Sequence, residues 1–161
     1  MACAVVSRTS CESVRLPNNT SIFRAELYAI MLAMRLICKR KEKNFIIFSD
    51  SMSSLQALNV FKLELDLIQK VLKDYLYLTA IGKPVILCWI PSHVNIPGNE
   101  KADCAAKSAL SLPITNMRFS AYDLAPHVSK FCLKEWQDIW DVCQGNKLYA
   151  IYRNVGDYHA I

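Results

Sequence analysis

Two short apolar runs, separated by helical patterns, constrain the fold of this 161-residue chain more than any other feature. Residues 45–48 (FIIF) and 85–89 (VILCW) carry no charged side chain. Uninterrupted apolar runs of this length are typical of strands that are covered on both faces in a parallel sheet. Between them the sequence predicts a short helix from Ser53 to about Asn59. It also predicts a second helix through residues 67–76, with Leu67, Val71 and Leu72 on one face and Gly82 and Pro84 after its end.

The rest of the first two thirds of the chain continues this alternation. Residues 2–8 and 12–16 read as two short strands, and Thr20 or Ser21 can cap a helix that runs to about Lys39. After the second apolar run, residues 91–98 form a loop and Asn99 is expected to cap a helix that ends near Leu110. Strands that alternate with helices predict an α/β layer fold.

The remaining residues differ in kind, and Leu112-Pro113 marks the predicted boundary. We therefore expect a domain over residues 1–112 and a helical extension over residues 113–161. Val128, Phe131 and Ile139 recur at helical spacing in the extension, with Trp136 nearby. Such a stripe is either a packing face or a platform on which nucleic-acid bases stack, and its lack of net positive charge favours packing.

The formal net charge of +5 lies wholly in residues 1–112, because residues 113–161 carry five basic and five acidic side chains. A mild basic excess suits an anionic partner. The candidate nucleic-acid contacts form the densest basic cluster: Arg35, Lys39, Arg40, Lys41 and Lys43. The alternative is that these cations only complement the dipole at the carboxyl end of a helix.

No stretch of the sequence is apolar enough to span a bilayer, and residues 1–6 lack the features of a signal peptide. We expect an intracellular protein with no membrane partner, and the sequence does not distinguish nucleus from cytoplasm. The seven cysteines form no C-x-x-C pair, and most lie in apolar segments, so we expect reduced, largely buried thiols.

Three carboxylates are the candidate catalytic groups. Glu26 lies beside the apolar stripe of its helix, Asp50 follows the strand that starts at Phe45, and Asp103 lies in the helix after Asn99. Each also has a structural explanation, respectively the margin of a stripe, the cap of the helix at Ser53, and complementation of a helix dipole.

Carboxylates from three elements of one small sheet can converge, and converging like charges need cations to stay ionised. Oxygen ligands without Cys or His favour Mg²⁺ or Mn²⁺, and two such ions can drive phosphodiester hydrolysis. His93, on the loop before Asp103, could then carry a proton or help the product leave.

Three segments carry a family resemblance: residues 21–30 (SIFRAELYAI), 48–58 (FSDSMSSLQAL) and 89–103 (WIPSHVNIPGNEKAD). They resemble signature blocks of type 1 ribonuclease H, and their sequence is most similar to that of the domain near the end of non-LTR retrotransposon polyproteins. The resemblance covers roughly residues 2–112, and the segment after it also resembles those polyproteins. It implies cleavage of the RNA strand of RNA–DNA hybrids with Mg²⁺. It places Glu26, Asp50 and Asp103 as metal ligands and His93 as a mobile catalytic histidine.

The sequence departs from the family pattern at its amino end. The resemblance implies a first, central strand that ends in a metal-bridging Asp within a block like T-D-G-S, and this chain shows no such block. We therefore expect an amino-terminally truncated RNase H-like three-layer α/β fold with a mixed sheet, whose first strand is missing, plus the helical extension. Strands on either side of the gap should have unpaired edges or pair directly. Asn95 replaces the usual glycine of the histidine loop, which is a mild change because Asn tolerates positive φ.

The leading hypothesis is a hybrid-cleaving ribonuclease H domain that is weakened or inactive without the first Asp. The main alternative is a non-catalytic nucleic-acid-binding remnant of a retrotransposon polyprotein. A further alternative is an incomplete reading of a longer gene. The expected partners are RNA–DNA hybrid and either a missing amino-terminal strand or the reverse transcriptase portion of the same polyprotein.

Overall fold

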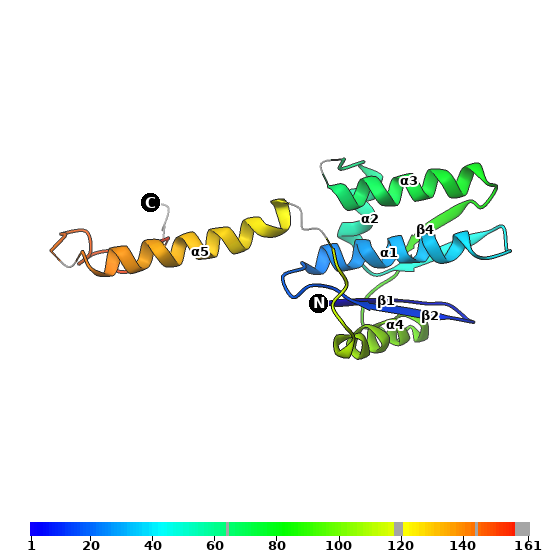
Figure 1. Ribbon diagram of the computed structural model, residues 1–161, viewed down its shortest axis with the longest axis horizontal. Helices are drawn as coiled ribbons and strands as arrows, with labels where there is room; N and C mark the ends of the chain where they lie inside the picture. The colour runs from blue at the N-terminus through cyan, green and yellow to red at the C-terminus, as the bar shows by residue number, and fades with distance from the viewer. Residues whose placement is uncertain (64, 118–120, 144, 157–161) are drawn as a thin grey trace. The chain divides into compact units, whose positions relative to one another are not determined.

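The structure is a computed structural model that describes residues 1–63, 65–117, 121–143 and 145–156. The chain divides into two compact units, residues 1–118 and 119–161. Strands and helices alternate along the first unit (Figure 1), so the predicted mixed α/β class is confirmed. Within the described ranges, no helix combines the length and the apolar character that a bilayer crossing requires.

The chain begins with an antiparallel hairpin of β1 (Ala2–Val6) and β2 (Cys11–Arg15). Ala2 lies opposite Arg15 and Val6 opposite Cys11, and Ser7 and Ser10 close the turn through a backbone hydrogen bond of 2.8 Å. The hairpin lies between α1 (Ile22–Cys38) and α4 (Pro97–Ser108) (Figure 1). It is therefore held by a helix on each face.

Both ends of α1 are satisfied by side chains. The Ser21 hydroxyl accepts a hydrogen bond from the Arg24 amide at 3.2 Å, as an N-cap residue should. At the other end, the Lys83 ammonium donates to the carbonyls of Ile37, Cys38 and Arg40 at 3.1, 2.9 and 2.5 Å. A lysine at this position satisfies carbonyls that the helix leaves unpaired and complements its dipole.

The second sheet pairs β3 (Phe45–Ser49) with β4 (Val85–Trp89) in parallel, with Phe45 opposite Val85. Parallel pairing was predicted, but coverage of both faces is wrong. Ile46, Phe48 and Ile86 are 55%, 59% and 61% exposed. Helices cover one face of this sheet, while α4 packs on the hairpin instead.

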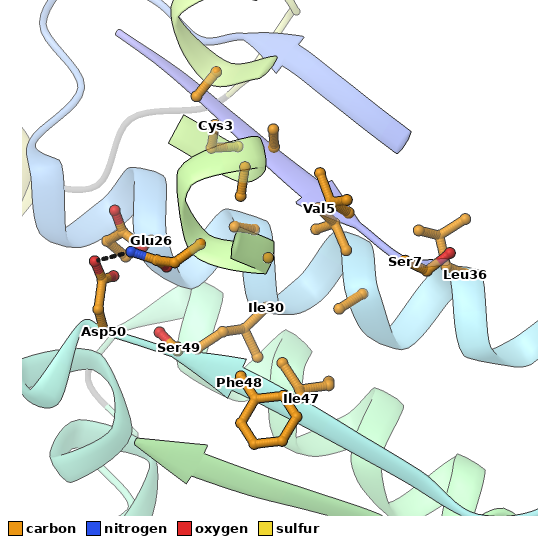
Figure 2. A pocket seen from close by; sticks show the side chains of 18 of the residues that line it. Cys3, Val5, Ser7, Glu26, Ile30, Leu36, Ile47, Phe48, Ser49 and Asp50 are labelled. Carbon is orange, nitrogen blue, oxygen red and sulfur yellow. Dashed lines mark hydrogen bonds between the residues drawn. The ribbon is translucent and has the colours of Figure 1, made fainter. Parts of the chain in front are cut away.

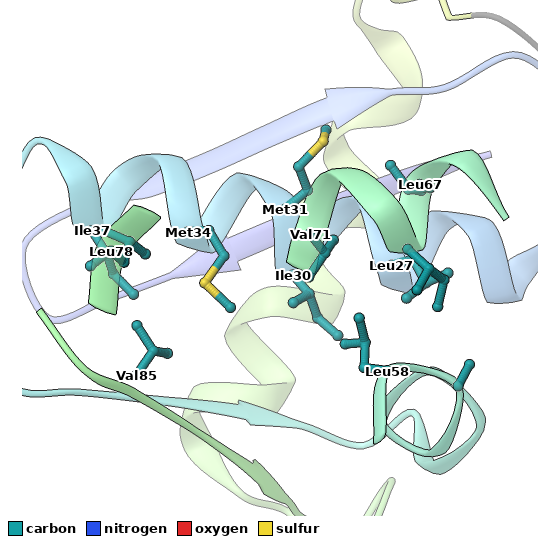
Figure 3. Close-up of a cluster of buried hydrophobic side chains, with 12 residues drawn as sticks. Leu27, Ile30, Met31, Met34, Ile37, Leu58, Leu67, Val71, Leu78 and Val85 are labelled. Atoms are coloured by element: carbon teal, nitrogen blue, oxygen red, sulfur yellow. The ribbon is translucent and has the colours of Figure 1, made fainter. Parts of the chain in front are cut away.

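The main core lies between α1, α2 (Met52–Asn59), α3 (Asp66–Ala80) and β4 (Figure 3). Apolar side chains of α1 face those of α3, as helical spacing of three and four residues requires. The buried members are Leu27, Ile30, Met31, Met34, Ile37, Ala57, Leu58, Leu67, Ile68, Val71, Leu78 and Val85. This packing fixes α1 against the β3–β4 sheet.

A partly buried ion pair joins the amino ends of α1 and α3. Arg24 is 4% exposed, and its Nη1 and Nη2 donate to the two carboxylate oxygens of Asp66 at 2.8 and 3.1 Å. Two parallel bonds between a guanidinium and a carboxylate fix orientation as well as distance. The pair therefore sets how the first turns of α1 lie against α3.

A smaller core joins the hairpin to α1. Cys3 and Leu16 of the hairpin region pack with Ala25 and Leu32 of α1. After α4, the 3₁₀ turn η1 (Ala109–Ser111) leads to Ile114, which forms a parallel bridge to Arg15. Thus α1 contributes side chains to both cores.

The two sheets are separate. In the part of the chain that the structure describes, β1 pairs with β2 and β3 pairs with β4, and no ladder joins β1 to β3. The fold therefore keeps two short sheets side by side on α1.

The second unit contains α5 (Ala121–Asp141) and the segment that follows it. The Trp140 indole N–H donates to the Tyr152 carbonyl at 2.7 Å, and the Trp140 ring lies 6.4 Å from that of Tyr149. Phe131 and Ile139 of the predicted stripe are 63% and 64% exposed. Packing within this unit therefore uses the Trp140 side of α5.

Candidate active site

Glu26, Asp50 and Asp103 all line one cavity of about 430 Å³ in the first unit. Glu26 extends from the second turn of α1, Asp50 follows the last residue of β3, and Asp103 lies on α4. Figure 2 shows Glu26 and Asp50 at the same end of this cavity. The fold thus brings three sequence-predicted carboxylates to one cavity from three different elements.

Asp50 lies in the turn between β3 and α2 and does not cap the helix. Ser51 is the N-cap residue, and its hydroxyl accepts from the Ser54 amide at 3.4 Å. The Ser54 hydroxyl, which is fully buried, lies 2.8 Å from the Ser51 hydroxyl. Because serines satisfy the helix start, the Asp50 carboxylate remains available to the cavity.

Asn99 holds the Asp50 carboxylate. Its amide nitrogen donates to Asp50 Oδ2 at 3.0 Å, the hydrogen bond drawn as a dashed line in Figure 2. The predicted capping role of Asn99 is wrong, because α4 begins at Pro97 with Ile96 as its N-cap residue and no side-chain cap. Trp89 adds a second link, since its indole N–H donates to the Asp50 carbonyl at 3.3 Å. Two elements therefore orient this acid.

His93 lies on the loop between β4 and α4, with Nδ1 3.9 Å from Asp103 Oδ2. Its side chain is 82% exposed, so solvent reaches the imidazole freely. His93 and Asn95 have φ angles of 55° and 59°, in the left-handed region. Asn enters that region more readily than most residues, which explains why Asn95 can occupy a position with glycine-like backbone geometry.

The cavity changes the proton affinity of Glu26. Burial raises the pKa of the Glu26 carboxyl above 4.5, and the nearby negative charges of Asp50 and Asp103 raise it further. Burial also raises the pKa of the Cys3 thiol to about 12, with the Glu26 carboxylate as a second cause. The site is therefore a region of negative potential in which a cation would be favoured.

The donor chemistry of these acids fits a hard divalent cation, since Mg²⁺ and Mn²⁺ prefer oxygen ligands. The spacing of the three carboxylates does not fit such an ion. Within the described ranges, no three His, Cys, Asp or Glu side chains lie close enough together to hold one ion. The structure thus brings the carboxylates to one cavity without forming a ligand cluster.

The basic cluster divides into two groups. Arg35, Lys39, Lys41 and Lys43 are exposed at and beyond the end of α1. Arg40 is half-buried, and its Nη2 donates to the hydroxyls of Ser10 and Ser7 at 2.6 and 3.3 Å. Four of the five predicted contacts are therefore open to a polyanion, and Arg40 ties α1 to the hairpin turn.

Asn99 and Trp89 were not predicted as site residues from the sequence. For Asn99 a signal existed, because it lies four residues before Asp103 and so shares its helix face. For Trp89, its position at the end of a strand next to Asp50's strand gave only a weak signal. Thiol burial was also overestimated, since Cys11, Cys104 and Cys132 are exposed and all seven cysteines are free.

Comparison with known families gives one match. Residues 1–111 match the family model described as RNase H. No curated protein matches the chain.

Proposed function

The chain belongs to the RNase H family, and from that premise we propose that its first unit is a type 1 domain that hydrolyses the RNA strand of RNA–DNA hybrids. The observation that supports this most is the cavity that Glu26, Asp50 and Asp103 share. Burial raises the pKa of the Glu26 carboxyl, and the nearby charges of Asp50 and Asp103 raise it further, which supports a shared site. Such a region suits chemistry that depends on bound cations and phosphate oxygens.

The proposed cofactor is Mg²⁺, with Mn²⁺ as the alternative, and Glu26, Asp50 and Asp103 are the residues that would hold it. A pair of such ions, when bound, supplies an activated water and stabilises the leaving oxygen of a phosphodiester. The Asn99 amide, bonded to Asp50 Oδ2, would keep that carboxylate turned in one direction. The three carboxylate side chains would have to move closer together to bind one ion.

His93 is the proposed proton carrier. Its imidazole is exposed, and its Nδ1 lies 3.9 Å from the Asp103 carboxylate. A histidine on a loop can accept or donate a proton near neutral pH without leaving solvent. Its role would therefore be proton transfer or product release at the edge of the site.

The proposed hybrid-binding surface consists of Arg35, Lys39, Lys41 and Lys43, with Arg40 at its margin. Exposed lysines and arginines contact phosphates without reading sequence. Binding through them would weaken as salt rises, because counterions compete for the backbone.

A polypeptide of these 161 residues alone is proposed to cleave slowly or not at all. The resemblance implies one more carboxylate, on a preceding strand, that would bridge both ions. The spacing of the three acids supports the alternative function, a non-catalytic nucleic-acid-binding remnant. In either case we propose descent from a retrotransposon polyprotein, with its reverse transcriptase portion as a partner.

The test is cleavage of a labelled RNA–DNA hybrid in Mg²⁺ by the 161-residue chain, by Asp50→Asn and by Asp138→Asn. Asp138 is exposed on α5 and gives a charge-matched control. If the chain cleaves the hybrid, and Asp50→Asn abolishes cleavage while Asp138→Asn preserves it, the result would support hydrolysis at this site. A near-normal rate of cleavage by the unsubstituted chain would refute the proposal that it cleaves slowly. Salt-dependent hybrid binding without cleavage would support the remnant. Failure both to cleave and to bind would contradict both functions.

A further inference from the structure

A second cavity, of about 1000 Å³, lies between β4 and α3. This volume is at the upper end of the roughly 300–1,000 Å³ that ligand pockets have. Val85, Ile86 and Leu87 all line the cavity. Successive side chains of a strand point to opposite faces of a sheet, so a cavity that reaches three consecutive residues lies along the edge of the strand. None of the described residues that line this edge groove lines the cavity of the three carboxylates.

The side of β4 that faces away from β3 presents backbone groups to the edge groove. The Ile90 N–H donates to the Ser49 carbonyl of β3 at 3.0 Å. Even-numbered residues of β4 therefore bond toward β3, and the alternation of the ladder leaves Val85, Leu87 and Trp89 facing the other way. Among the described residues, no strand pairs with this side of β4. A row of unpaired N–H and C=O groups is a template for a further strand.

Strand β4 lacks the side chains that often keep a sheet edge from pairing. Charged residues and prolines serve this purpose in many proteins, but residues 85–89 (VILCW) carry no charge and no proline. Pro84 and Pro91 lie just outside β4, and neither has an N–H to donate. An added strand would therefore pair over about five residues.

The segment after α2 forms one wall of the edge groove. Phe61 and Leu63 line it, and their side chains are 63% and 53% exposed. The Gln69 side chain donates to the Leu63 carbonyl at 2.5 Å, so α3 holds this segment in place. The φ angle of Phe61 is 51°, a left-handed conformation that a bulky residue adopts only at a cost. The backbone therefore keeps an aromatic ring at the groove although the ring is open to solvent.

Helix α3 covers one face of β4 and contributes apolar side chains to the edge groove. Val85 and Leu87 point toward that face, because both pack in the main core, whereas Ile86 points to the opposite face and is exposed. Leu72 and Leu76 of α3 line the groove. A strand that continued the sheet would direct every second side chain toward α3 and the others toward solvent. Its sequence should therefore alternate apolar and polar residues.

Lys73 defines the charge of the expected partner. Of the described residues that line the edge groove, it is the one with a charged side chain. The ammonium is exposed, so a carboxylate can meet it at the rim of the groove without being buried. Complementary charge of this kind directs partner choice and association rate more than affinity. An acidic residue in the partner would therefore be favoured and a basic one disfavoured.

We propose that the edge groove binds an extended peptide of a partner protein, in which apolar residues alternate with polar ones and an acidic residue meets Lys73. Its backbone would pair with β4, and its apolar side chains would fill the space beside α3. Strand addition takes affinity from main-chain hydrogen bonds and specificity from pockets for alternate side chains. A lipid could fill the same cavity but would leave the backbone groups of β4 unpaired. Strand β4 of a second copy offers no acid to Lys73.

The test uses the 161-residue chain and a synthetic peptide in which Val alternates with Thr, with Asp at both ends. Backbone amide exchange is followed by NMR, with and without saturating peptide. The Leu87 N–H, which faces the groove, should exchange at least about tenfold more slowly with peptide. Exchange of the Cys88 N–H, which already bonds toward β3, should not change. The same peptide with a central proline should give no protection, since proline cannot donate to a ladder.

Two substitutions on α3 separate the groove from the rest of the surface. Leu76→Lys places a charge in the groove at a site that is 67% exposed, and it should abolish protection of Leu87. Tyr77→Lys is the matched control, because Tyr77 is exposed on the same helix but does not line the groove, and it should preserve protection. The far-UV circular dichroism of both variants should equal that of wild type.

Lys73→Glu tests the charge. It should weaken binding of the peptide with terminal Asp residues by about two- to fivefold and strengthen binding of a peptide with Lys in their place by a similar factor. Equal binding of the two peptides by wild type would overturn the assignment of an acidic partner.

Unchanged exchange at Leu87, or equal protection by the proline peptide, would overturn the inference. Protection of Phe48, whose N–H faces the opposite edge of the sheet, in place of Leu87 would overturn the choice of site. Protection of Leu87 that rises with protein concentration in the absence of peptide would replace the partner protein by a second copy. None of these readouts requires hydrolysis, so they are independent of the proposed ribonuclease activity.

Discussion

Removing the charge of Asp66 should destabilise the first unit through the ion pair that joins α1 to α3. Arg24 is 4% exposed and Asp66 is 40% exposed, so the pair is intermediate between a surface and a buried salt bridge. Exposed pairs contribute up to about 1 kcal/mol, and breaking a buried pair costs about 3–5 kcal/mol. We therefore expect Asp66→Asn to lower the free energy of unfolding by about 2 kcal/mol, because the buried guanidinium loses the charge of the Asp66 carboxylate.

Urea unfolding of four proteins measures this: wild type, Asp66→Asn, Arg24→Met and the double variant. The double variant should lose less than the sum of the single losses, with a coupling of about 1–2 kcal/mol. Lys70→Met is the control, since Lys70 lies 3.8 Å from the same carboxylate but is 60% exposed, and it should cost less than about 0.5 kcal/mol. A coupling energy no larger than the loss in this control would show that the Arg24–Asp66 pair does not stabilise the unit.

The Arg24–Asp66 pair should also make the stability of the first unit depend on pH. The hydrogen bond from Arg24 lowers the pKa of the Asp66 carboxyl below 3.8 in the folded state. A carboxyl whose pKa is lower when folded contributes stability above its unfolded pKa and loses it as pH falls through the folded pKa. Wild type should therefore lose stability relative to Asp66→Asn below about pH 3.8.

Three further outcomes follow from groups in or near the cavity. Lys83→Met should lower the free energy of unfolding by about 1–3 kcal/mol, because three carbonyls at the end of α1 lose their donor. Lys73→Met, at an exposed site, is the control and should change the free energy of unfolding little. Equal losses in the two variants would contradict this prediction. Glu26→Gln should match wild type in stability below pH 4.5 and exceed it at pH 7, since a carboxyl with a raised folded pKa loses stability as pH rises through that pKa. Urea unfolding that gives the two proteins equal stability at pH 7 would disprove this. Iodoacetamide at pH 8 should label exposed Cys11 and spare Cys3, whose thiol pKa is about 12, and equal labelling by mass spectrometry would count against the burial of Cys3.

The sequence predicted the type and order of most elements because their signals are local. Spacing of apolar residues locates α1 and α3, and the two apolar runs locate β3 and β4. Coverage of a strand is not local, since it depends on where distant helices pack. Ile46 and Phe48 are exposed because α4 packs on the hairpin, and no pattern within residues 45–49 contains that information.

The candidate site was predictable in its residue types and not in its contacts. A carboxylate beside an apolar stripe or at the end of a buried strand costs free energy unless something pairs with its charge. For this reason Glu26 and Asp50 could be selected from the sequence. The role of Asn99 depends on a partner 49 positions away, and an asparagine just after Pro-Gly reads locally as a cap. The Lys83 contact with the end of α1 spans more than 40 positions and is equally invisible to spacing.

The use of α1 by both cores has a consequence for the order of assembly. The β1–β2 hairpin spans the 14 residues from Ala2 to Arg15 and can form by local contacts, whereas β3 and β4 pair across 40 positions and must close a long loop first. Neither sheet keeps its buried face without α1, which packs against Cys3 on one side and Val71 on the other. Substitutions on both faces of α1 should therefore slow refolding, while those in the strands mainly speed unfolding. The helix, rather than either sheet, would act as the folding nucleus of this unit.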